Sequence, residues 1–169
     1  MLKNIQIVPG AAYDKTKVLQ MNTFRALDYC LSGQRVKDPT DVQTSKALGN
    51  NQVQGYSLDE LALDHSTKTL IKIDTEGCED KVLCGASKLL KSKPWILCEA
   101  TNHQSSEAIT RQLKAYDYSF YVINNKSMKL FHVESVEPLY RNGKPDLHML
   151  NRLLIPREQI SSLQKILSR

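Results

Sequence analysis

Four side chains that can face positive charge or accept a proton follow two short apolar runs of the sequence. They are Asp74, Glu76, Glu99 and His103. A carboxylate accepts hydrogen bonds from hydroxyl groups, and a histidine can accept a proton near neutral pH. These residue types and their spacing predict a polar site that orients a substrate hydroxyl, faces a cation or takes up a proton.

Each of these residues also has a structural interpretation. Asp74 and Glu76 can complement the positive end of a helix. Glu99 can pair with Lys72, because Lys72 interrupts an otherwise apolar run and shares a strand face with Asp74. His103, a single histidine in a predicted loop, can simply be solvated.

The elements that position these residues form one repeating unit. Leu70, Ile71 and Ile73 form a short apolar, β-branched run, which is typical of a strand buried on both faces. Gly77 permits a tight turn, and the apolar spacing of residues 78–90 predicts an amphipathic helix that ends before Pro94. Residues 95–99 read as the next strand. A right-handed βαβ unit places the acids at the carboxyl ends of adjacent parallel strands, where open α/β sheets bind ligands.

Elements are also expected on both sides of this unit. Further strands are predicted at residues 4–8, 17–21, 52–56, 119–123, 129–133 and 152–155, the fourth and fifth forming a β-hairpin. Further helices are predicted at residues 24–31, 58–63 and 105–116 and after Pro156. Ser57 with Glu60 resembles a capping box, and Ser105 or Ser106 is a candidate cap. Residues 38–51 read as a polar loop.

Three motifs carry a family resemblance: LIKIDTEGCE (residues 70–79), VLCGA (82–86) and PWILCE (94–99). Together with looser matches over residues 4–157, they resemble the FkbM family of S-adenosylmethionine-dependent methyltransferases. The resemblance implies an α/β fold with a partial Rossmann-like, mostly parallel sheet, flanking helices and a C-terminal β-hairpin. It also implies a single domain over residues 1–169 that begins at the third strand of the family.

The resemblance implies S-adenosylmethionine as cofactor and a hydroxyl of a sugar or small metabolite as methyl acceptor. It places Ala11 and Ala12 where the fold holds adenine, although ordinary turn packing is an equal alternative. No two glycines are spaced for a cofactor-binding turn. We therefore expect the isolated chain to bind the cofactor weakly or not at all. The alternative function is a non-catalytic remnant or interaction subunit of this fold.

The same resemblance implies an open sheet edge at residues 70–74, since two family strands would precede the chain. Unpaired strand edges invite association. We expect residues 5–8 to shift inward and pair with this edge; the other outcomes are pairing with a second chain, as in a homo-oligomer or with a missing N-terminal segment, or poor solubility.

Composition sets further limits. The net charge is +5 with scattered basic residues, and no nucleic-acid-binding module accompanies it. No apolar run is long enough to span a membrane. The cysteines lack metal-ligand spacing, which disfavours a zinc site and is typical of a reduced, cytoplasmic protein. A basic module for membranes or nucleic acid remains a third alternative.

Overall fold

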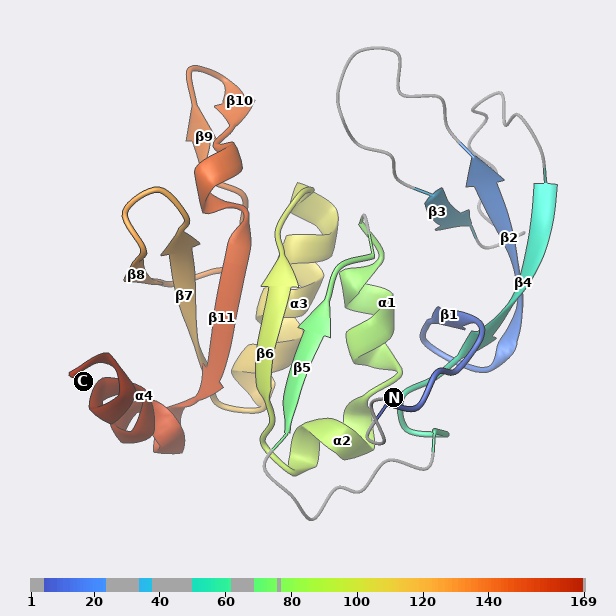
Figure 1. Cartoon of the computed structure of the whole chain (residues 1–169), viewed down its shortest axis with the longest axis horizontal. Coiled ribbons are helices and arrows are strands. Elements are labelled where there is room, and N and C mark those ends of the chain that lie inside the picture. Colours follow the sequence, from blue (N-terminus) through green and yellow to red (C-terminus); the bar gives the residue numbers. More distant parts are fainter. Residues whose placement is uncertain (1–4, 24–33, 38–49, 62–68, 76, 169) are drawn as a thin grey trace.

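The computed structural model describes residues 5–23, 34–37, 50–61, 69–75 and 77–168. Within these residues the chain forms a five-stranded sheet, a four-stranded sheet and a two-stranded hairpin (Figure 1). The described helices lie mainly against the five-stranded sheet. None of them is long and apolar enough to cross a membrane.

The bounds of the elements are as follows. The strands are β1 (Ala11–Ala12), β2 (Lys17–Thr23), β3 (Gln34–Lys37), β4 (Asn50–Tyr56), β5 (Leu70–Ile73), β6 (Trp95–Glu99), β7 (Tyr118–Asn124), β8 (Lys129–Val133), β9 (Tyr140–Arg141), β10 (Lys144–Pro145) and β11 (Asn151–Pro156). The α-helices are α1 (Glu79–Cys84), α2 (Ser87–Lys91), α3 (His103–Ala115) and α4 (Ile160–Leu167). Two 3-10 helices are η1 (Leu147–Met149) and η2 (Arg157–Gln159).

The predicted central unit is confirmed. β5 and β6 are adjacent and parallel, with Leu70 opposite Trp95 and Ile73 opposite Cys98. The predicted hairpin is confirmed as β7 and β8, and the strand at residues 152–155 is confirmed as β11. The helix expected after Pro156 begins as η2 and continues as α4.

The expectation of a mostly parallel sheet is wrong, because the sheet is mixed. Its order is β5-β6-β11-β7-β8, and β11 runs antiparallel to both of its neighbours. The chain passes through β9, β10 and η1 near the end of the sheet where β6 and β7 finish (Figure 1). It therefore enters β11 in the opposite direction.

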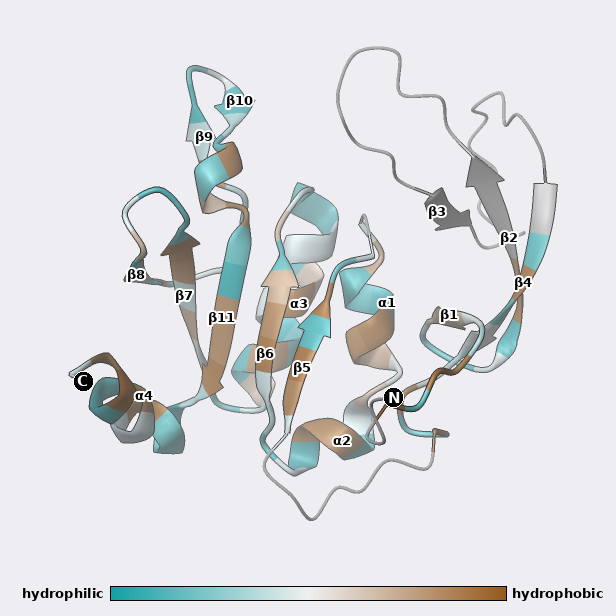
Figure 2. Cartoon of the chain, in the orientation of Figure 1, coloured by the Kyte–Doolittle hydropathy of each residue, from teal (hydrophilic) through white to brown (hydrophobic). Residues whose placement is uncertain are grey.

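One face of this sheet carries the core. Inward residues of its strands pack against residues of the helices. The strands contribute Ile73, Ile96, Phe120 and Leu154, and the helices contribute Val82, Leu83, Leu89, Ile109 and Leu113. Each fully buried side chain of this size contributes about 1.5–3 kcal/mol through removal of apolar area from water. In Figure 2 β11 changes from hydrophilic at its start to hydrophobic toward its end.

The expectation that the strand at residues 70–74 is buried on both faces is wrong. Leu70 is 63% exposed, and Lys72 is also exposed, whereas Ile73 is buried. At the other end of the outward face, the Trp95 indole N–H donates to Gln159 Oε1 at 2.6 Å and so anchors the segment before α4. Over β5 that face meets solvent.

The helix predicted over residues 78–90 is two helices, α1 and α2, separated at Gly85. Here the backbone passes so close to Tyr13 that a Cβ on Gly85 would lie 2.2 Å from the Tyr13 carbonyl oxygen. Asp59 then supplies an external cap for α2, because its carboxylate accepts from Lys88 N at 2.8 Å and Leu89 N at 3.0 Å. The break lets a segment of the N-terminal half pack onto the helical layer.

The N-terminal half forms the four-stranded sheet, in the order β1-β4-β2-β3. The strands expected at residues 17–21 and 52–56 are confirmed as β2 and β4. The strand expected at residues 4–8 is wrong: residues 5–8 form no strand, and Ile7 is 83% exposed. Residues 5–8 are all exposed, so their alternating pattern buries no apolar face.

Other local predictions have mixed outcomes. Residues 58–60 form a turn rather than the start of a helix, with Glu60 N donating to the Ser57 carbonyl oxygen at 3.2 Å. The predicted helix at residues 24–31 and most of the predicted loop at residues 38–51 lie outside the described residues; positions 50 and 51 belong to β4.

Candidate active site

The carboxyl ends of β5 and β6 bring two of the predicted site residues together. Ile73 lies opposite Cys98 in the parallel register. The next step of that register places Asp74 beside Glu99. Asp74 is exposed and Glu99 is half-buried, on the face of the sheet opposite the helices. Two carboxylates therefore stand side by side at the ligand-binding edge of the parallel pair.

Lys72 restrains one of these carboxylates. Its Nζ lies 2.7 Å from Asp74 Oδ2, and the two side chains are 45% and 51% exposed. From the sequence, Glu99 was suggested as a partner of Lys72. The ion pair that the structure shows for Lys72 is with Asp74. An exposed ion pair of this kind contributes at most about 1 kcal/mol. The pair therefore orients Asp74 while leaving it accessible to a ligand.

A buried carboxylate shapes the turn that follows β5. Glu79 is 1% exposed, and its Oε1 accepts from Thr75 N at 3.1 Å, Thr75 Oγ1 at 3.2 Å and Gly77 N at 3.0 Å. Gly77 has φ +103°, a conformation that favours glycine. The sequence alone does not reveal this role, because an acid at position 79 suits the start of a helix equally well. Glu76, a predicted site residue, lies outside the described residues.

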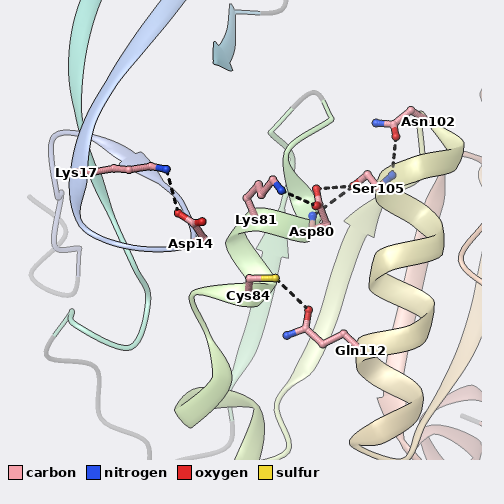
Figure 3. Close-up of polar contacts among 8 residues, drawn as sticks. All are labelled: Asp14, Lys17, Asp80, Lys81, Cys84, Asn102, Ser105 and Gln112. Atoms are coloured by element: carbon pink, nitrogen blue, oxygen red, sulfur yellow. Dashed lines mark hydrogen bonds and ion pairs between the residues drawn. The ribbon is translucent and has the colours of Figure 1, made fainter. Parts of the chain in front are cut away.

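The N-terminus of α3 is locked to the N-terminus of α1 beside this turn (Figure 3). Asn102 Oδ1 accepts from Ser105 N at 2.7 Å, so Asn102 is the cap and not Ser105 or Ser106. The prediction failed because the Ser105 hydroxyl is used elsewhere: it donates to Asp80 Oδ1 at 3.1 Å. A Cβ on Gly77 would lie 3.0 Å from Asn102 Nδ2, so the turn and the cap are in close contact.

His103 is the first residue of α3 rather than part of a loop. Its side chain is 68% exposed, and its Nδ1 lies 3.7 Å from Glu137 Oε1. This contact becomes an ion pair when the imidazole is protonated. His103 therefore has a carboxylate neighbour, and it begins α3 at the end of the sheet where β6 finishes (Figure 1).

Arg152 supports the loop that carries Glu137. Its side chain is fully buried, and its guanidinium donates to the carbonyl oxygens of Glu137 and Met149, both at 2.5 Å. Burial lowers the pKa of Arg152 to about 10. The facing thiol of Cys98 is also buried, and burial, reinforced by Glu79, raises its pKa to about 12. Sequence reasoning missed Arg152, since an arginine in a short strand gives no local signal of burial.

Ala11 and Ala12 lie in a different sheet from the acids. They form β1, which pairs in parallel with β4 opposite Gly55 and Tyr56. Ala12 is partly buried and packs against the core of the five-stranded sheet. The structure thus groups Asp74 with Glu99, places His103 at the same end of the sheet, and places the two alanines in the four-stranded sheet.

This arrangement can bind a cationic or hydroxyl-bearing ligand and accept a proton. Among the described residues no group of three or more His, Cys, Asp and Glu side chains is arranged to hold a metal ion. A family model described as "Methyltransferase FkbM domain" matches residues 21–120. No curated protein and no solved structure shows significant similarity to the chain.

Proposed function

Because the chain belongs to the methyltransferase FkbM domain family, we propose that it serves methyl transfer from S-adenosylmethionine to a hydroxyl group of a small metabolite or glycan. The observation that carries the proposal is the position of Asp74 and Glu99 directly after Ile73 and Cys98, at the carboxyl ends of adjacent parallel strands. Ligands of open α/β sheets bind at this edge.

The residues at this edge fit the charged and hydroxyl-bearing parts of the cofactor. A sulfonium, an ammonium and a ribose diol all suit carboxylate partners. The glycines do not supply a further cradle: a Cβ on Gly10 would lie 2.5 Å from the Gln54 carbonyl oxygen, and one on Gly77 would approach Asn102. These close approaches are made to the chain's own atoms. Contact of Ala11 and Ala12 with adenine remains part of the proposal.

When bound, the cofactor supplies a methyl group on a positively charged sulfur. The chain's own residues orient the acceptor and handle its proton. Asp74, held by Lys72, accepts a hydrogen bond from the acceptor hydroxyl, and Glu99 adds a second negative charge beside it. His103, whose Nδ1 lies 3.7 Å from Glu137 Oε1, takes up the proton released from the hydroxyl. Glu79 holds Thr75 and Gly77, which follow Asp74 in the chain.

Calorimetric titration with S-adenosylmethionine tests the binding step. We expect weak binding, with a Kd above about 100 μM, because carboxylates and not a glycine turn hold the ligand. Asp74→Asn should weaken binding further. Asp117→Asn is a matched control, since Asp117 also forms an exposed ion pair, with Arg157 at 3.2 Å, on another part of the surface.

Two results would contradict this proposal. Equal binding by the Asp74→Asn and Asp117→Asn variants would show that the cofactor does not use the acidic edge. A chain that shows no heat at millimolar cofactor would favour the second candidate, a non-catalytic interaction subunit. The exposed edge of β5 is the observation that supports this second candidate.

A further inference from the structure

The backbone of β5 has one partnered side and one side that faces away from the sheet. Among the described residues its neighbour is β6 alone. Trp95 N donates to the Thr69 carbonyl oxygen at 3.0 Å, which fixes the odd-numbered residues of this strand as those that bond to β6. The N–H and C=O groups of Leu70, Lys72 and Asp74 therefore point away from β6.

This outer edge is accessible. Leu70 is 63% exposed, and the side chains of Lys72 and Asp74 are about half exposed. The segment that was expected to pair here, residues 5–8, forms no strand. A row of accessible backbone groups beside an exposed leucine is a template for another strand.

We propose that a second copy of this chain pairs with this edge, so that residues 72–74 of the two chains run antiparallel about a two-fold axis at Ile73. Residues directly opposite each other in an antiparallel pair have side chains on the same face of the sheet. Opposite residues must therefore both be odd-numbered or both be even-numbered, so the axis passes through a residue and not between two residues. Two-fold symmetry makes the contact self-complementary and closed. The proposal does not depend on methyl transfer.

The charges select this register among its neighbours. With the axis at Lys72 or Asp74, two like charges lie directly opposite, which is unfavourable. With the axis at Ile71, Lys72 lies opposite an apolar leucine. With the axis at Ile73, each Lys72 lies opposite Asp74 of the partner subunit, and both residues have outward-pointing backbone groups. That register alone combines hydrogen-bonded pairs with two opposite-charge pairs.

The interface uses the two charged side chains that already form an ion pair within one chain. Lys72 and Asp74 form an ion pair at 2.7 Å in the single chain, and the dimer exchanges it for two pairs between chains. The partner subunit's Lys72 then lies beside Asp74, at the edge that also contains Glu99. Because the pairs are exposed, we expect dimerisation to weaken as salt screens them.

Charge variants with sedimentation analysis test the register. At about 100 μM protein and low salt we expect a dimer. Lys72→Asp and Asp74→Lys each place like charges opposite across the axis, so each variant alone should dimerise at least tenfold more weakly. An equimolar mixture of the two variants restores opposite charges at both positions and should form heterodimers.

Controls make the outcome decisive. Lys129→Asp, in the exposed strand β8 at the other edge of the sheet, should leave the dimer unchanged. Circular dichroism confirms that each variant is folded, which is expected because both altered side chains are exposed. A monomeric unaltered chain at this concentration, single variants that still dimerise, or a mixture that stays monomeric would each overturn the proposal.

Discussion

Replacing Glu79 by alanine is expected to lower the free energy of unfolding by about 3–5 kcal/mol. The substitution removes one buried acceptor and leaves three donors, on Thr75 and Gly77, without their partner. Hydrogen bonds to a charged group contribute about 1.5–3 kcal/mol each, and a buried donor left unsatisfied costs about 1–3 kcal/mol. Relaxation of the turn toward water limits the sum, because Thr75 and Gly77 are only half-buried.

Urea unfolding followed by tryptophan fluorescence measures this change. Trp95, the one tryptophan in the sequence, lies in β6 and reports on the sheet. Glu79→Gln retains an oxygen that can accept the same bonds and should cost less than half as much. Glu107→Ala, on the exposed face of α3, is a charge-matched control and should change stability by less than about 0.5 kcal/mol.

Two outcomes would refute this reasoning. A loss below about 1 kcal/mol for Glu79→Ala would mean that the three bonds carry little net stability. Equal losses for the alanine and glutamine variants would show that burial volume matters rather than the acceptor. Amide hydrogen exchange at Thr75 and Gly77 gives a local readout, since both amides should exchange faster in the alanine variant.

Two further substitutions test other parts of the fold. Gly85→Ala should destabilise the protein by about 1–3 kcal/mol, measured by thermal unfolding, because its methyl group would meet the Tyr13 carbonyl oxygen; a neutral effect would mean that the two segments separate easily. The thiol of Cys98 has a pKa raised to about 12 from 9.0, so it stays protonated when folded while the unfolded chain ionises. Its stabilising effect is therefore complete below pH 9 and is lost as the pH rises from 9 toward 12. The pKa of Arg152, about 10, is lowered by folding, so its deprotonation makes stability rise with pH above pH 10. Between pH 9 and 10 the urea midpoint should therefore fall less in Cys98→Ala than in the unaltered chain. An equal fall in both proteins would contradict the raised pKa of Cys98.

The sequence was most informative where periodicity and a turn residue agreed. The change of period at Gly77 predicted the parallel pair β5 and β6 and the position of Asp74 beside Glu99, and the structure has both strands as expected. The break at Gly85 was not predictable from residues 78–90 alone, because its cause is contact with Tyr13 and a cap from Asp59, both distant in sequence.

Long-range contacts also explain the other differences. The antiparallel direction of β11 depends on how β9, β10 and η1 return the chain, which no local pattern encodes. The role of Glu79 depends on burial, and its spacing suited a helix start equally well. The start of α3 moved to His103 because Ser105, a good cap by type, bonds instead to Asp80 of another helix.

The central position of β11 has a consequence for how the protein folds during synthesis. β11 separates β6 from β7 in the sheet, yet it is made after both of them and after the β7–β8 hairpin. Until residues 151–156 leave the ribosome, the facing edges of β6 and β7 lack the strand that joins them. Exposed edges in a nascent chain favour misassembly, and pairings between residues far apart in sequence form slowly. The last step of sheet assembly is thus the insertion of a late strand into a gap, and chaperones that shield strand edges should bind the chain until that moment.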